Sequence, residues 1–295
     1  MPQTPSIVLS HILSALLLGI GCIIGAGCAG GVRKTDNPSA NHVSVSKYDN
    51  VSSAVLFERA NAECRLNASA LSLNSAIEYY QELEQRAPAV TVSVALYDIR
   101  WRMAKAMFLL SEILSEREEK LDWLARSERV AEIAMKDCPG CVEGYYYAAV
   151  AKGRRAEISG NGFRALKLVK QVLSLGKKAV EIDESFEFGA PLRLLAMLHA
   201  KAPPWPASVG DIDLAVELAK RALSISDYPM NHLAMAEVLI EDDDLQQAIG
   251  ELDHVLDAPL DDGKDAWNET WKQEAVVWRP YAAELKRQIT LEETD

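Results

Sequence analysis

Apolar residues recur at steps of three and four along almost the whole chain after residue 50, which is the spacing of one helix face. No segment shows the alternation of apolar and polar residues that a half-buried strand would need. Short runs rich in Gly, Pro, Asn or Asp interrupt the helical pattern at intervals. The pattern therefore predicts an all-α chain of antiparallel helix pairs over residues 51–295.

Five helix pairs and one last helix account for the pattern. The predicted helices span 51–66 and 70–87, 92–115 and 118–136, 141–158 and 163–182, two helices within 189–224, then 229–241 and 244–257, and finally 264–289. The last helix carries Trp267, Trp271 and Trp278 on one stripe, so we expect it to cover the open end of the stack. Pro280 lies inside it, which predicts a kink or a split near Trp278.

The repeat period is the more specific signal. Segments 215–222 and 248–255 place small or apolar residues at the same offsets, 33 residues apart. Tetratricopeptide (TPR) repeats have this period and use small residues where their two helices pack closely. The fold predicted is a set of TPR-like hairpins that form a short superhelical solenoid with a C-terminal capping helix.

The N-terminus has a different composition. Residues 6–28 contain no Asp, Glu, Lys or Arg and end in small residues followed by Cys28. This predicts a lipoprotein-type signal peptide over 1–27, lipidation of Cys28 and a flexible polar tether over 28–50. A plain cleaved signal peptide and an uncleaved anchor helix are the alternatives. The neutral Ala29 favours a periplasm-facing position on the outer membrane.

Charge excludes one class of partner. The formal net charge of −12 argues against nucleic acid, which requires basic surfaces. It also argues against electrostatic docking on anionic lipid, and leaves a lipid anchor as the expected membrane contact.

Export would place the remaining cysteines in an oxidising compartment. Cys138 and Cys141 flank a Pro-Gly turn, so we expect a structural disulfide there. The same spacing occurs in thiol–disulfide enzymes, but these need a βαβ frame that the chain does not show. Cys64 is expected to be a small buried residue.

Several segments occur in an order that resembles a known family. These are 165–170, 173–184, Phe188–Pro191, Lys201–Asp211 and 215–222, of which the Gly-Ala-Pro element and the Pro-Trp-Pro element followed by Gly-Asp are the specific ones. Together they resemble the TatT family, the T-component lipoproteins associated with TRAP transporters. The resemblance implies a lipid-anchored helical-repeat protein that contacts the periplasmic solute-binding subunit of a TRAP transporter. It also implies a small apolar or carboxylate ligand in an internal cavity.

The loop 201–211 supplies most of the candidate ligand or partner pocket. A Trp between prolines is expected either to line or plug a pocket or to pin the loop to the repeat surface. The candidate residues are Tyr146, His199, Pro203, Trp205 and Pro206. For His199, a hydrogen-bonded position at a helix end is the alternative.

No catalytic, metal or cofactor motif is present, so we expect no enzyme activity, no metal and no cofactor. The favoured function is a TRAP-type transport accessory protein. The first alternative is a scaffold for an envelope assembly or secretion machine, and a redox protein that uses Cys138 and Cys141 is the less favoured one. A homo-oligomer is compatible with either of the first two.

Overall fold

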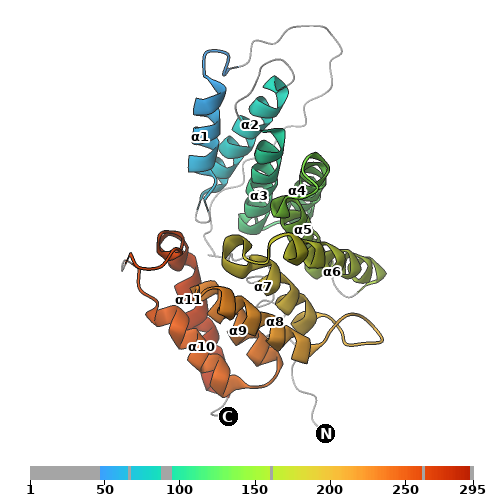
Figure 1. Cartoon of the computed structure of the whole chain (residues 1–295), viewed down its shortest axis with the longest axis vertical. Helices are drawn as coiled ribbons and strands as arrows, with labels where there is room; N and C mark the ends of the chain where they lie inside the picture. The colour runs from blue at the N-terminus through green and yellow to red at the C-terminus, as the bar shows by residue number, and fades with distance from the viewer. Residues whose placement is uncertain (1–46, 66–67, 88–94, 160–161, 261–262, 293–295) are drawn as a thin grey trace.

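The computed structural model describes residues 47–65, 68–87, 95–159, 162–260 and 263–292, and there it is all-α (Figure 1). The predicted signal peptide and residues 28–46 of the predicted tether lie outside the described residues. Five helical hairpins follow one another and a last helix closes the stack. The helices are α1 Ser53–Glu63, α2 Ala70–Arg86, α3 Leu96–Ile113, α4 Arg117–Asp137, α5 Val142–Ser159, α6 Phe163–Asp183, α7 Phe186–Lys201, α8 Ile212–Ile225, α9 Pro229–Glu241, α10 Leu245–Asp257 and α11 Asn268–Glu292.

The hairpins stack in two layers. The first helices of successive hairpins, α3, α5, α7 and α9, touch one another as well as their hairpin partners. Most residues of α5, α7 and α9 are buried, whereas α6, α8 and α10 each bury only one stripe. The first helices therefore form an inner layer and the second helices an outer layer. The predicted all-α architecture of stacked hairpins is confirmed.

Small residues permit the close contacts between helices. Ala215, Ala219 and Ala248 are fully buried on the outer-layer helices, at positions that the 33-residue period singles out. At Gly176 a Cβ atom would lie 2.6 Å from a side-chain carbon of Leu195, so α6 and α7 approach closely only because this residue is glycine. A larger side chain at these positions would separate the layers.

Helix α11 covers the end of the stack. Trp271 and Trp278 are fully buried in the core cluster of the last two hairpins. We predicted a kink or a split near Trp278. The split is wrong, because α11 is a single helix that continues through Pro280. Proline removes the donor to the carbonyl of Val276, which lies on the exposed face where water can satisfy it.

The start of α7 is irregular. Glu187, Phe188 and Gly189 have φ values of 42°, 60° and 97°, which form a left-handed turn at the beginning of the helix. The buried Asn231 stabilises this turn, since its Nδ2 donates to the carbonyls of Phe188, Ala222 and Ser226 at 2.8–3.0 Å. One amide group thus connects the turn, the end of α8 and the start of α9.

We predict that Asn231→Ala lowers the free energy of unfolding by about 2–4 kcal/mol, because it removes the hydrogen bonds to three carbonyl groups and the Oδ1 acceptor of Arg193. The measurement is urea denaturation followed by circular dichroism. Asn74→Ala is the matched control, since Asn74 is exposed and its Nδ2 donates only to its own helix. Equal stability losses for the two variants would contradict this role for Asn231.

Candidate functional site

Charged and aromatic side chains from five elements converge on the inner layer. These side chains form two groups, and we call the first of them the inner cluster. Its members are Lys105 of α3, Tyr147 of α5, Glu187 and Arg193 of α7, Tyr228 immediately before α9, and Glu274 of α11. Lys105 and Glu274, which are 169 positions apart in the chain, therefore interact electrostatically within this cluster.

Glu187 is the centre of the inner cluster. Its Oε1 accepts hydrogen bonds from Lys105 Nζ at 3.2 Å and from the Tyr147 hydroxyl at 3.0 Å. Burial opposes ionisation of Glu187, but the Lys105 charge and these hydrogen bonds outweigh it and lower its pKa. Burial likewise disfavours the charged form of Lys105, and the carboxylate of Glu187 raises its pKa well above the usual value. Glu187 therefore remains a carboxylate and Lys105 an ammonium group at neutral pH.

This ion pair is partly buried and partly exposed, although it belongs to the inner layer. The side chains of Lys105 and Glu187 are 33% and 38% exposed, respectively. Glu187 also occupies the left-handed turn, a backbone conformation that ordinary residues avoid and that occurs often at binding sites. The pair is thus available for contact with another molecule.

Aromatic rings surround the ion pair. Trp101 stacks on Tyr147 with ring centres 5.8 Å apart, and Tyr146 packs edge-on against both Tyr147 and Phe186. Burial raises the pKa of Tyr146 and Tyr147, so both hydroxyl groups are neutral. Apolar rings with a few convergent polar groups are typical of binding sites.

The cluster extends to the last helix. The Tyr228 hydroxyl donates to Glu274, and the Arg193 guanidinium lies over the Tyr228 ring at 5.6 Å. Burial raises the pKa of Glu274, which the charges of Lys105 and Arg193 partly oppose. The capping helix is therefore part of the candidate site as well as of the fold.

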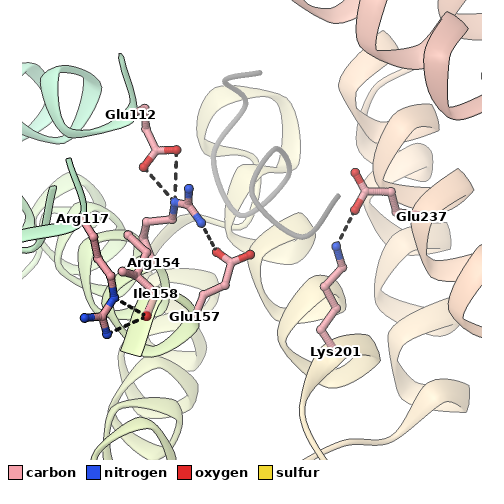
Figure 2. Close-up of polar contacts among 7 residues, drawn as sticks. All are labelled: Glu112, Arg117, Arg154, Glu157, Ile158, Lys201 and Glu237. Carbon is pink, nitrogen blue, oxygen red and sulfur yellow. Dashed lines mark hydrogen bonds and ion pairs between the residues drawn. The ribbon is translucent and has the colours of Figure 1, made fainter. Parts of the chain in front are cut away.

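A second group lies toward the C-terminal ends of the inner helices, and we call it the charged row (Figure 2). Arg154 Nε donates to both carboxylate oxygens of Glu112 at 2.9 and 3.1 Å, and its Nη1 donates to Glu157 Oε2 at 2.7 Å. One hairpin further, Lys201 Nζ donates to Glu237 Oε2 at 2.7 Å. Each pair joins neighbouring inner helices, apart from the contact within α5.

Negative charge in this row is incompletely compensated. Arg154 serves two carboxylates, and Glu157 Oε1 is buried without a hydrogen-bond donor among the described residues. Burial raises the pKa of Glu112, Glu157 and Glu237, although Arg154 or Lys201 opposes the effect. Glu112 and Glu157 also lie in the last turns of their helices, where the helix dipole disfavours negative charge.

The residues predicted for the pocket do not form one site. Tyr146 is buried beside the inner cluster, whereas Trp205 is 83% exposed and Pro203 and Pro206 are exposed with it. With its side chain this exposed, Trp205 neither plugs a pocket nor pins the loop in this structure, and its place in a ligand or partner site stays a prediction. His199 pins the loop instead, because its Nδ1 donates to the Val209 carbonyl at 2.7 Å, as expected for a hydrogen-bonded histidine at a helix end.

The cysteines have structural positions. Cys138 and Cys141 form a disulfide across the turn between α4 and α5. Cys64 is a free, half-buried thiol, and burial raises its pKa to about 11, which makes it unreactive at neutral pH. Within the described ranges no group of His, Cys, Asp or Glu side chains could hold a metal ion.

Sequence reasoning missed the inner cluster and the charged row. A signal was present, because Lys105, Glu112 and Arg154 occur among apolar residues of α3 and α5, in segments that the helical period places inside. A charge at such a position needs a partner when the helix packs on several sides. The partner could not be named, since it belongs to another hairpin.

No family model and no curated protein matches the chain. Among solved structures, the chain is similar to a thermophilic TPR protein of Thermus thermophilus, with 15% identity and a TM-score of 0.54. The match covers 76% of this chain and 99% of that protein. The likeness shows that this chain has a TPR-like fold.

We predict that Arg154→Leu destabilises the protein by about 3–5 kcal/mol at pH 7, because it leaves Glu112 and Glu157 buried without their cation. Each carboxylate has a raised pKa in the folded state, so protonation stabilises the fold and the penalty shrinks as the pH falls toward the ordinary glutamate range. Urea denaturation at pH 5 and pH 8 measures both effects.

Glu157→Gln is the matched control for that substitution. Glutamine keeps an oxygen that accepts from Arg154 and removes the excess negative charge, so we expect the stability at pH 8 to change by less than about 1 kcal/mol. A large loss in this variant, or a pH-independent penalty for Arg154→Leu, would show that charge compensation is not what Arg154 contributes.

Proposed function

We propose that this chain is a non-catalytic interaction protein whose inner layer binds a protein partner. The ion pair of Lys105 and Glu187, about one-third exposed and set among aromatic rings, is the observation that carries the proposal. The TPR-like fold supports the same conclusion, since stacked repeats build extended binding surfaces.

We also propose that the protein is attached to the cell envelope through Cys28 and faces the periplasm. The support is the uncharged segment 6–28, which ends in small residues before this cysteine. None of the helices in the described part of the chain has the length and apolarity needed to cross a membrane. An anchor at the N-terminus would leave the hairpins free to meet a periplasmic partner.

For the partner, we propose the solute-binding subunit of a TRAP-type transporter. The support is the resemblance to the TatT family, which rests on Phe188–Pro191 and Lys201–Asp211. Two properties of the inner cluster agree with a small ligand that carries a carboxylate. Arg193 forms no ion pair with any described residue, and the rings of Tyr228 and Phe188 lie beside it with centres 4.9 Å apart.

The alternative is a scaffold for an envelope assembly or secretion machine. The inner layer would serve an extended or helical peptide from such a machine equally well, because the two functions use the same surface. The identity of the partner is therefore the measurement that separates them. The redox alternative has less support, since the disulfide lies in a turn outside the inner cluster.

Crosslinking in cells, followed by affinity capture of the full-length protein and mass spectrometry, tests the partner. We expect recovery of a periplasmic solute-binding subunit, and a loss of at least fivefold in that recovery for Glu187→Lys, because the substitution reverses the charge at the centre of the inner cluster. Arg126→Ala on the outer layer is the control and should retain full recovery. Recovery of secretion or assembly components alone would reject the TRAP proposal and favour the scaffold.

The anchor is tested separately with Cys28→Ser. The proposal predicts that the wild-type protein incorporates a labelled fatty acid and partitions into detergent, and that the variant does neither. If Cys28→Ser still incorporates the labelled fatty acid, the modified residue is not Cys28. A wild-type protein without label would contradict the lipid anchor and leave the proposal for the inner layer untouched.

A further inference from the structure

Five consecutive apolar residues are exposed at the tip of the loop between α7 and α8. They are Pro203, Pro204, Trp205, Pro206 and Ala207. The first residue of α6, Phe163, is 94% exposed, which makes it the most exposed large apolar side chain of the described part of the chain, and Trp205 at 83% is second. A contiguous run of exposed apolar residues, unlike a single one, is typical of a contact surface.

The two aromatic residues belong to the same edge of the solenoid. The turn that precedes Phe163 leaves the end of α5, and the loop of Trp205 leaves the end of α7, next to it in the inner layer. Glu157 and Lys201 in these helix ends are near enough to interact electrostatically, and Figure 2 shows the first joined to Arg154 and the second to Glu237. Figure 1 shows the loop and α6 on one side of the stack.

Backbone hydrogen bonds join the two ends of the loop. Gly210 N donates to the Pro203 carbonyl and Asp211 N to the His199 carbonyl, both at 2.9 Å. A Cβ atom on Gly210 would lie 2.1 Å from the Ala202 carbonyl oxygen, so the two ends of the loop approach as closely as only glycine allows. Trp205 is therefore presented to the outside on a closed loop.

Helix α6 supplies positive charge on the same side. It contains five basic residues and two acidic ones, in a chain whose net charge is −12. Arg164, Lys167, Lys170 and Lys177 are exposed, and none forms an ion pair with a described residue. The net charge of the chain therefore conceals a basic surface. The acidic run 241–244 lies in the turn between α9 and α10, one hairpin further along.

We propose that this surface, which consists of Phe163, the loop 203–207 and the basic face of α6, docks on an anionic lipid membrane. Indole rings favour the interface between headgroups and acyl chains, and basic side chains are attracted to anionic headgroups. Weak contacts of both kinds add to a lipid anchor. The proposal goes beyond the partner binding proposed for the inner layer, and it orients the hairpins on the membrane.

Fluorescence quenching by brominated lipid tests the contact of Trp205. The full-length protein is reconstituted into phosphatidylcholine vesicles with or without about one-third phosphatidylglycerol, an amount chosen to attract basic side chains. Quenching should rise at least twofold with phosphatidylglycerol and fall to less than half in Trp205→Phe. Trp123→Phe is the matched control, since Trp123 lies on α4 outside this surface, and it should keep the full quenching.

Charge reversal tests the basic face. Lys167→Glu should reduce the phosphatidylglycerol-dependent quenching at least twofold, while Arg59→Glu, an exposed position on α1, should leave it unchanged. The proposal is overturned if Trp205→Phe retains the wild-type quenching, or if phosphatidylglycerol and Lys167→Glu have no effect. In that case a protein partner would be the remaining occupant of the loop. Binding of a partner to the inner layer is measured independently by the Glu187→Lys capture.

Discussion

The inner helices are packed on several sides, so a charge on their remaining face needs a nearby counter-charge, which in most cases belongs to another hairpin. Lys105 forms an ion pair with Glu187 two hairpins away. Arg154 pairs with Glu112, and Lys201 pairs with Glu237. Such pairs contribute little net stability, because desolvation offsets their attraction, but breaking one leaves a charge that the interior cannot accommodate. They therefore fix the order and spacing in which hairpins can stack, and they leave a polar surface along the inner layer.

The left-handed turn at the start of α7 joins the two halves of the stack. One core cluster covers the first three hairpins and the second covers the last two with α11, and the residues of this turn and of α7 contribute to both. A Cβ atom on Gly189 would lie 3.4 Å from Ala222 of α8, and Asn231 Nδ2 donates to the Phe188 carbonyl of the turn. The same turn orients Glu187 toward Lys105 and Tyr147. Stability and the candidate site thus depend on one backbone irregularity.

Local signals predicted most of the fold. The steps of three and four located the eleven helices of the described residues, and the side chains of Asp211 and Asp244 cap α8 and α10. The buried alanines followed from the 33-residue period. The expectation of a split at Pro280 failed because a proline on the solvent side of a well-packed helix costs one hydrogen bond that water replaces. The exposure of Trp205 could not be read from the sequence, because an aromatic residue in a loop does not reveal which way the loop points.

The sequence by itself determined the helices, the hairpin pairing and the closing helix, because these depend on spacing within roughly 30 to 40 residues, the length of one repeat. Only the tertiary structure decided which charges meet. The inner cluster and the charged row join residues from α3, α5, α7, α9 and α11, and a helical period gives the face of a residue but not its neighbour on another hairpin. The basic surface of α6 was hidden for a related reason, since net charge is a sum over the chain and only folding distributes it in space.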